Sequence, residues 1–128
     1  MKKETVGTLT KKLQKVFNEY IRKRDEDKPC ISCLQYFDKK DAGHFFAVSG
    51  YSGLRFDEFN VNGECARCNR FDESHLIGYA ENLKKRIGEE EYANLKMRAE
   101  EYKRNGYKFG RVELREMIEE YKNKINEL

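Results

Sequence analysis

The stretches Cys30-Ile31-Ser32-Cys33 and Cys65-Ala66-Arg67-Cys68-Asn69 decide the fold of this chain. Two residues between paired cysteines let both thiolates of one tight turn contact the same ion, and two such turns complete a tetrahedral zinc site. The segment between the pairs is polar and contains glycines, so it can fold back and bring the two turns together. We therefore predict a structural Zn²⁺ held by Cys30, Cys33, Cys65 and Cys68.

Disulfides, which four cysteines can pair in three ways, and buried free thiols are the alternatives to zinc. The start of the chain, Met1-Lys2-Lys3-Glu4-Thr5, lacks the apolar core of a signal peptide. No stretch approaches the ~18 apolar residues of a membrane span. We therefore expect a cytoplasmic protein with no membrane contact, in which reducing conditions disfavour stable disulfides.

The length of 128 residues predicts a single domain, 1–128. Charged and hydrophobic residues each make up 38%, so the core is lean and a metal that contributes folding energy would compensate. The net charge of +3 is divided unevenly: +6 over 1–24, −4 over 25–75 and +1 over 76–128. An acidic centre beside a basic arm suits a nuclease, because carboxylates bind divalent cations and lysines bind phosphates. Ordinary solvated surface charge is the alternative.

Apolar residues three and four positions apart predict an amphipathic helix over 9–24, which Thr8 or Thr10 caps and Pro29 follows. Its apolar stripe is a candidate core face or dimer seam, and its other face is basic. The basic residues that we expect to contact DNA phosphates are Lys11, Lys12, Lys15, Lys23 and Arg24 of this helix, with Arg67 and Arg70 near the second cysteine pair.

The rest of the chain predicts an α+β fold. Residues 30–74 are irregular with short strands, one of them at 44–48. A helix is expected from Ser74 to about Ile87, followed by helices over about 89–104 and 111–128. The apolar residues of the first of these that we expect to face inward are Leu76, Ile77, Ala80, Leu83 and Ile87. This gives a zinc-stabilised core at 30–88 and a helical extension at 89–128.

The residues around the cysteine pairs carry a resemblance to nucleases. His44 lies on the expected strand, Asn60 precedes Cys65 by five residues and Asn69 directly follows Cys68. This arrangement resembles the HNH, or ββα-metal, nucleases and the endonuclease VII-like junction resolvases. The resemblance implies a ββα-metal core.

Longer motifs are similar to the phage lambda NinG/Rap recombination family, over roughly residues 9–88. They are Pro29-Cys30-Ile31-Ser32-Cys33, Asp41-Ala42-Gly43-His44-Phe45, Arg55-Phe56-Asp57-Glu58-Phe59-Asn60-Val61-Asn62 and Cys65-Ala66-Arg67-Cys68-Asn69-Arg70-Phe71. The resemblance implies a phage- or prophage-encoded, metal-dependent endonuclease selective for branched recombination intermediates such as Holliday junctions or D-loops. Coordinated cutting of two strands implies a homodimer, with the apolar stripes of the terminal helices as candidate seams.

The resemblance also assigns roles to residues. His44 corresponds to the general base, Asn60 to the residue that orients it, and Asn69 to a ligand of a catalytic Mg²⁺ or Mn²⁺. Gly43 departs from the pattern, because many HNH enzymes have a metal-binding aspartate or histidine immediately before the base. The acid must then come from elsewhere, and Asp41 is the nearest candidate, followed by Asp57 or Glu58.

Several alternatives stay open. His44 could instead be the metal ligand, with His75 or another group as the base, or it could be a structural residue or a zinc ligand. Asn60 and Asn69 could be turn residues, since asparagine favours turns and helix caps. His75 could be an ordinary surface residue. The whole protein could be a non-catalytic, zinc-containing DNA-binding recombination accessory, or an interaction adaptor that binds no nucleic acid.

Overall fold

The structure, a computed structural model, describes residues 4–128 and combines helices with one small sheet. The elements are α1 (Val6–Arg24), β1 (Asp41–His44), the 3-10 helix η1 (Ser52–Leu54), β2 (Val61–Glu64), α2 (Ala66–Arg70), α3 (His75–Ile87), α4 (Glu89–Asn105) and α5 (Arg111–Glu127). The mixed α+β class is therefore confirmed. Within residues 4–128, no helix has the length and apolar character needed to cross a membrane.

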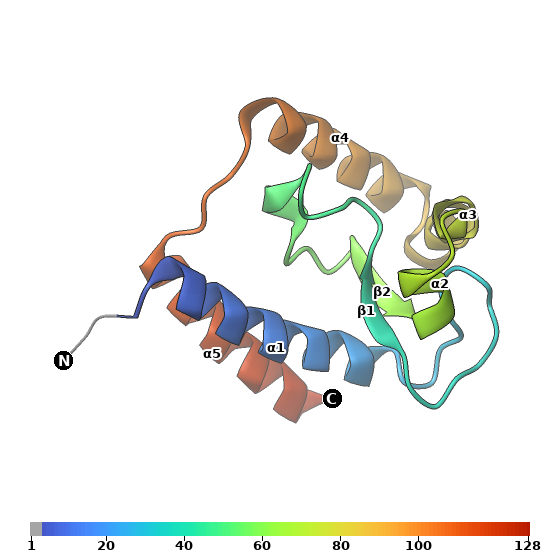
Figure 1. The fold of residues 1–128 in the computed structure, drawn as a ribbon, viewed down its shortest axis with the longest axis horizontal. Helices are drawn as coiled ribbons and strands as arrows, with labels where there is room; N and C mark the ends of the chain where they lie inside the picture. The colour runs from blue at the N-terminus through green and yellow to red at the C-terminus, as the bar shows by residue number, and fades with distance from the viewer. Residues whose placement is uncertain (1–3) are drawn as a thin grey trace.

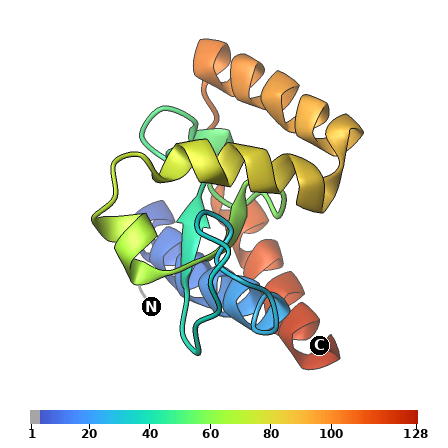
Figure 2. The ribbon, with the colours of Figure 1, turned by 90° about the vertical axis from the view of Figure 1, so that its right-hand side faces the viewer.

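The sheet lies between two pairs of helices, with α1 and α5 on one side and α3 and α4 on the other (Figures 1 and 2). Its strands are antiparallel, and Asp41 pairs with Glu64 while His44 pairs with Val61. Successive side chains of a strand point to opposite faces. Asp41 and Glu64 therefore share one face with Gly43, and His44 shares the other with Val61.

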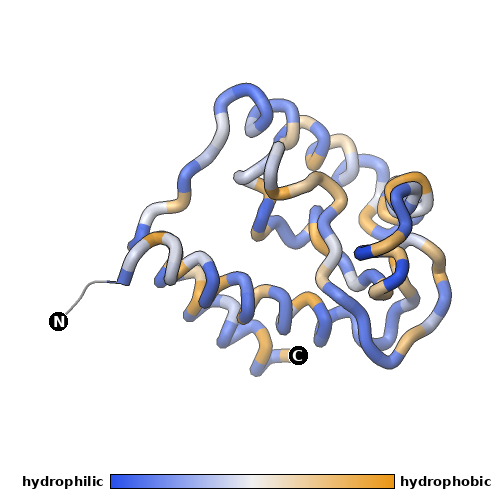
Figure 3. The backbone as a smooth tube through the Cα atoms, in the orientation of Figure 1, coloured by the Kyte–Doolittle hydropathy of each residue, from blue (hydrophilic) through white to orange (hydrophobic). Residues whose placement is uncertain are grey.

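The terminal helices α1 and α5 pack side by side along their apolar stripes (Figure 1). Figure 3 shows hydrophobic and hydrophilic residues alternating along both helices. The buried residues of this first cluster include Leu9, Leu13, Phe17 and Ile21 of α1, and Leu114, Ile118 and Tyr121 of α5. Because both stripes are buried within one chain, they are not the free dimer seams that the sequence suggested.

A second apolar cluster joins α3 and α4 to the first cysteine turn. Its buried members are Ile31, Leu54, Tyr79, Leu83, Leu95 and Ala99. The expected inward face of α3 is partly wrong, because the side chains of Leu76 and Ile77 are 41% and 75% exposed. Tyr79 and Leu83, four residues apart, define the buried face instead, and the first turn of α3 extends beyond it.

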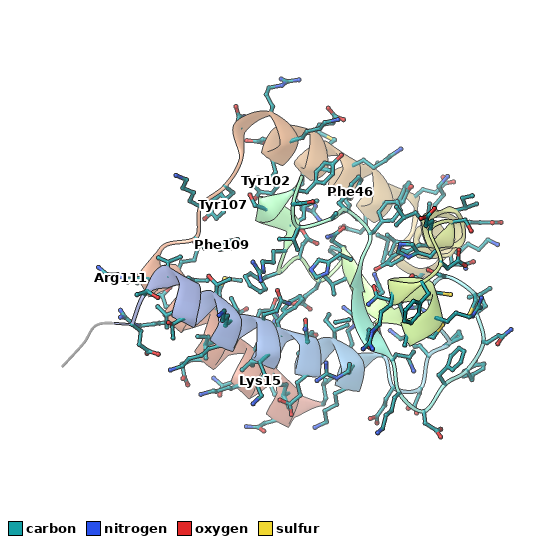
Figure 4. All side chains as sticks on the ribbon, in the orientation of Figure 1. Lys15, Phe46, Tyr102, Tyr107, Phe109 and Arg111 are labelled. Atoms are coloured by element: carbon teal, nitrogen blue, oxygen red, sulfur yellow. The ribbon has the colours of Figure 1, made fainter. Side chains whose placement is uncertain are left out.

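Aromatic side chains of the connection between α4 and α5 join the two clusters (Figure 4). The ring centroids of Tyr102 and Tyr107 are 5.7 Å apart, and those of Tyr107 and Phe109 are 4.8 Å apart. Phe109 then meets Phe56 of the first cluster edge-on at 5.4 Å. Such edge-to-face contacts stabilise the packing beyond the area they bury.

Two boundaries differ from the sequence-based expectation. The cap of α1 is Thr5, whose hydroxyl oxygen accepts from the backbone N–H of Thr8 at 3.1 Å, so the helix begins before residue 9. The strand expected at 44–48 is wrong, because β1 ends at His44. The backbone of Phe46 beyond it bonds to the side chain of Asn60 instead of to a strand partner.

Candidate functional site

The four cysteines converge on one point. Their sulfur atoms all lie within 4.8 Å of one another, and none forms a disulfide. The backbone N–H of Cys65 points at the sulfur of Cys30, at 3.3 Å. Burial raises the pKa of the Cys30 and Cys68 thiols, and a bound cation would stabilise both as thiolates. This donor set fits the tetrahedral thiolate ligands of a structural Zn²⁺.

Helix α3 packs tightly against the first cysteine turn. A Cβ added at Gly78 would lie 2.2 Å from the carbonyl oxygen of Ser32, so only glycine permits this approach. One turn later, the amide of Asn82 donates to the carbonyl of Ile31 at 2.8 Å. The same contact brings His75, at the start of α3, close to the sheet.

Asn69 of α2 meets Asp41 of β1. The amide nitrogen of Asn69 donates to Oδ2 of Asp41 at 3.0 Å, and the Arg70 guanidinium bonds both oxygens of the same carboxylate at 2.9 Å. The two residues that we expected to bind the catalytic ion are therefore neighbours, on the face that Gly43 shares.

His44 lies at the end of β1, on the face that packs toward α1. Its Nε2 is 2.9 Å from the carbonyl oxygen of Arg55, whose side chain donates to Gln14 of α1. Burial lowers the pKa of His44, and this outweighs the opposite effect of the carbonyl. Among the hydrogen bonds of residues 4–128, none joins the His44 ring to Asp41 or Asn69.

Asn60 is fully buried and shapes the loop that follows His44. Its side-chain oxygen accepts from the N–H of Phe46 at 2.8 Å, and its amide donates to the carbonyls of Phe46 and Leu54, both at 3.1 Å. Its own carbonyl accepts from the N–H of Phe45 at 2.9 Å. Asn60 thus acts on His44 through the backbone beside it, with no direct bond to the ring.

Sequence reasoning missed Glu64, the last residue of β2. It is fully buried, and its Oε2 accepts from the hydroxyl of Ser32 and lies 2.6 Å from Nδ1 of His75. His75 is accordingly a partner of an interior carboxylate, with a side chain only 17% exposed. Its position at a helix start gave no sign of this, because the contact depends on how α3 packs.

The other acids considered for the ion are used elsewhere. Asp57 forms a two-bond ion pair with Arg98 of α4, at 2.9 and 3.2 Å. Glu58 accepts from Tyr20, Tyr121 and Lys124. Neither lies with Asn69, so we remove both from the candidate ligands.

The expected phosphate-binding residues divide into two groups. For Arg24 the expected phosphate contact is corrected, because all three guanidinium nitrogens donate within the chain. Their acceptors are the side chains of Asp25 and Asn62 and the carbonyls of Glu58 and Val61. The exposed residues are Lys11, Lys12, Lys15, Lys23, Arg67 and Arg70. Four of these have partners within the chain: Lys12 pairs with Glu4, Lys23 with the carbonyl of Ile125, Arg67 with the sulfur of Cys68, and Arg70 with Asp41.

Comparison with known proteins gives a consistent result. The family described as "Bacteriophage Lambda NinG protein" matches residues 1–128. The protein ninG of Escherichia phage 933W is 34% identical over 119 residues, covering 92% of this chain and 57% of the relative. That of Escherichia phage lambda is 33% identical, covering 92% of this chain and 56% of the relative. That of Salmonella phage P22 is 40% identical over 79 residues, covering 61% and 39%.

No solved structure matches the chain. The chain spans little more than half the length of the 933W and lambda relatives. The family match nevertheless covers every residue, and the chain belongs to the bacteriophage lambda NinG family.

Proposed function

We propose that this protein is a metal-dependent endonuclease that cuts branched DNA, such as Holliday junctions or D-loops, during phage recombination. The observation that carries the proposal is the contact of Asn69 with Asp41. It joins the residue after the last of the four cysteines to the strand that ends in His44, and the element order β1, β2, α2 supports the proposal of an HNH-like ββα core.

In this proposal His44 is the general base. The Arg55 carbonyl can only accept a hydrogen bond, so Nε2 carries the ring proton and Nδ1 is free to take a proton from water. Asn60 fixes the backbone after the ring, and Asn69 with a carboxylate would hold Mg²⁺ or Mn²⁺. A bound divalent cation would stabilise the negative charge of the pentacovalent phosphate.

The DNA backbone would be bound by Lys11, Lys12 and Lys15 of α1 together with Arg67 of α2. Figure 4 marks Lys15 on α1. Each phosphate contact releases counterions, so affinity should fall steeply with salt. Replacing Lys11 and Lys15 by Gln should reduce the slope of log affinity against log salt by about 2, as two lost contacts require. An unchanged slope would remove this helix from the DNA surface.

The decisive experiment is cleavage of a four-way junction and of a linear duplex with the same arm sequences, in Mg²⁺, Mn²⁺ or chelator. We expect metal-dependent cutting of the junction only, and loss of cutting with retained binding for His44→Ala. Lys108→Ala, an exposed change in the α4–α5 connection, is the matched control. Complete absence of metal-dependent cutting would defeat the nuclease proposal.

A non-catalytic role, as a zinc-containing accessory protein that binds branched DNA, is the second candidate. It is favoured by one observation: among residues 4–128, the four cysteines are the only group of three or more His, Cys, Asp or Glu side chains arranged to hold an ion. Junction binding that does not change with His44→Ala, and no cutting in any metal, would support it.

The remaining proposals concern the whole protein. We propose one domain of residues 1–128, with the zinc-stabilised core at 30–88 and the helical extension at 89–128, acting in the cytoplasm of the bacterial host. A homodimer would have to use a surface other than the buried stripes of α1 and α5. Light scattering during size-exclusion chromatography, with and without junction DNA, tests the dimer.

A further inference from the structure

One carboxylate oxygen in the interior has no partner. Glu64 has no exposed surface, and its Oε2 is occupied by Ser32 and His75. Its Oε1 is buried and makes no hydrogen bond to any residue that the structure describes. A buried carboxylate oxygen left unpaired is costly, so a positively charged or hydrogen-bonding group is expected at this atom.

This oxygen occupies the place where a side chain at position 43 would begin. A Cβ added at Gly43 would lie 2.2 Å from Oε1 of Glu64 and 2.9 Å from its Cβ. The resemblance to HNH enzymes implies a metal-binding aspartate or histidine at position 43. The absence of a side chain there makes room for a carboxylate that comes from the neighbouring strand.

The surroundings of Glu64 suit a hard divalent cation. Asp41 is directly opposite in the strand register and on the same face, and Asn69 approaches that face from α2. The Asp41 carboxylate already carries the Arg70 guanidinium on both oxygens, whereas Glu64 Oε1 is free. Mg²⁺ is bound through one or two carboxylates together with substrate phosphates, so a cage of three protein ligands is not required.

We propose that Glu64 is the carboxylate ligand of the divalent cation, Mg²⁺ or Mn²⁺, in place of the acid that Gly43 lacks. Ser32 and His75 are positioning residues: they hold Oε2, so that Oε1 is the oxygen turned to the ion. This inference rests on the proposed nuclease function, and it replaces Asp41 by Glu64 as the direct ligand.

The test measures Mn²⁺ binding to the zinc-loaded protein, and the electron paramagnetic resonance signal of free Mn²⁺ is the readout. Glu64→Gln keeps the size of the side chain and removes its charge, and we expect Mn²⁺ affinity to fall at least about tenfold. Asp57→Asn is the matched control, since Asp57 pairs with Arg98 of α4 away from this face, and its Mn²⁺ affinity should not change. Zinc content is measured for each variant to show that the cysteine site is intact.

Two further measurements do not require Glu64→Gln to fold. Ser32→Ala and His75→Gln should each weaken Mn²⁺ binding about tenfold, because Oε2 loses one holding group. In the unaltered protein, Mn²⁺ should broaden the amide resonances of Gly43 and Glu64 before those of Asp57. Broadening that spares Gly43 and Glu64, or equal Mn²⁺ affinity of Glu64→Gln and the unaltered protein, would overturn the inference.

Cleavage measured on the same samples separates the two proposals. If the junction is cut and the Mn²⁺ affinity does not depend on Glu64, the nuclease proposal stands and the role of Glu64 is overturned. If the Mn²⁺ affinity depends on Glu64 but no junction is cut, the cation site stands and the nuclease proposal is defeated.

Discussion

The His44 ring is held in the tautomer that a general base needs. The Arg55 carbonyl fixes the proton on Nε2 and leaves the lone pair on Nδ1. Burial lowers the pKa of His44, so the ring stays neutral to lower pH than a histidine with the ordinary pKa of 6.5. A base that is already neutral does not lose activity as the pH falls toward that value.

We therefore predict that the rate constant of junction cleavage stays near its plateau at about pH 6.5 and falls only at lower pH. The measurement is single-turnover cleavage between about pH 5 and about pH 8 at constant ionic strength, with metal in excess. Junction binding is followed in parallel, so that weaker DNA binding is not mistaken for a protonated base. A rate that halves above about pH 7 would contradict this role of His44.

The amide of Asn60 replaces backbone partners that the loop after β1 cannot find elsewhere. Asn60→Ala would leave the N–H and carbonyl of Phe46 and the carbonyl of Leu54 without this partner. We predict a loss of about 3 kcal/mol in the free energy of unfolding, because each unpaired buried group costs about 1–3 kcal/mol. Urea unfolding of zinc-loaded protein measures it. Asn94→Ala on the exposed face of α4 is the control, and a similar small loss in both variants would refute the claim.

Residue spacing was sufficient to predict the cysteine site but not the Glu64 contact. Each cysteine pair is local, so spacing alone shows that two thiolates share a turn. The contact of His75 with Glu64 depends on how closely α3 approaches the first cysteine turn, and this is set by Gly78 against Ser32. The missing side chain at Gly78 leaves no pattern in the sequence from which that approach can be predicted.

Helix α5 is held to the core by Glu58 as well as by its apolar stripe. Tyr121 and Lys124 of α5, and Tyr20 of α1, all donate to the Glu58 carboxylate at 2.7 to 2.9 Å. Burial alone would raise the pKa of Glu58, but these three donors outweigh it and lower the pKa below its ordinary 4.5. The ionised carboxylate therefore stabilises the folded protein.

The pH dependence follows from the direction of this shift. The stabilisation is fully present above the unfolded pKa of about 4.5 and is lost as the pH falls through the lower folded pKa. We predict that Glu58→Gln unfolds more easily than the unaltered protein at neutral pH, and that the difference shrinks below about pH 4.5. Thermal unfolding followed by circular dichroism checks this. A difference that stays constant, or grows, as the pH falls would contradict it.

The long helices could be predicted because their apolar residues repeat at helical spacing, and α4 and α5 lie close to where that spacing placed them. The sheet was harder, because a four-residue strand carries almost no pattern. Phe45 and Phe46 continue the apolar run beyond His44, yet they pack as a pair at 4.8 Å and turn away. The Asn60 side chain, fourteen residues later, ends the strand.

The helix pairs that carry the two apolar clusters lie on opposite sides of a very small sheet (Figure 2), and this makes the cysteine site important to the whole molecule. The first cysteine turn contacts α3 through Ser32 and Ile31, and the second leads from β2 into α2. The buried Cys30, Cys65 and Cys68 and the partly buried Cys33 bring these turns together. Without a cation, the raised pKa values of Cys30 and Cys68 favour neutral thiols, which cannot replace metal–sulfur bonds.

We predict that purified protein contains one zinc ion per chain and that a strong zinc chelator at neutral pH lowers its melting temperature by well over about 10 °C, because structural zinc contributes directly to folding. Mass spectrometry measures the zinc content, and circular dichroism measures the melting temperature. Cys68→Ser should melt low with or without chelator, whereas the unaltered protein should recover when zinc is restored. If a reductant destabilises the protein and a chelator does not, then the cysteines form disulfides and the core has a different origin.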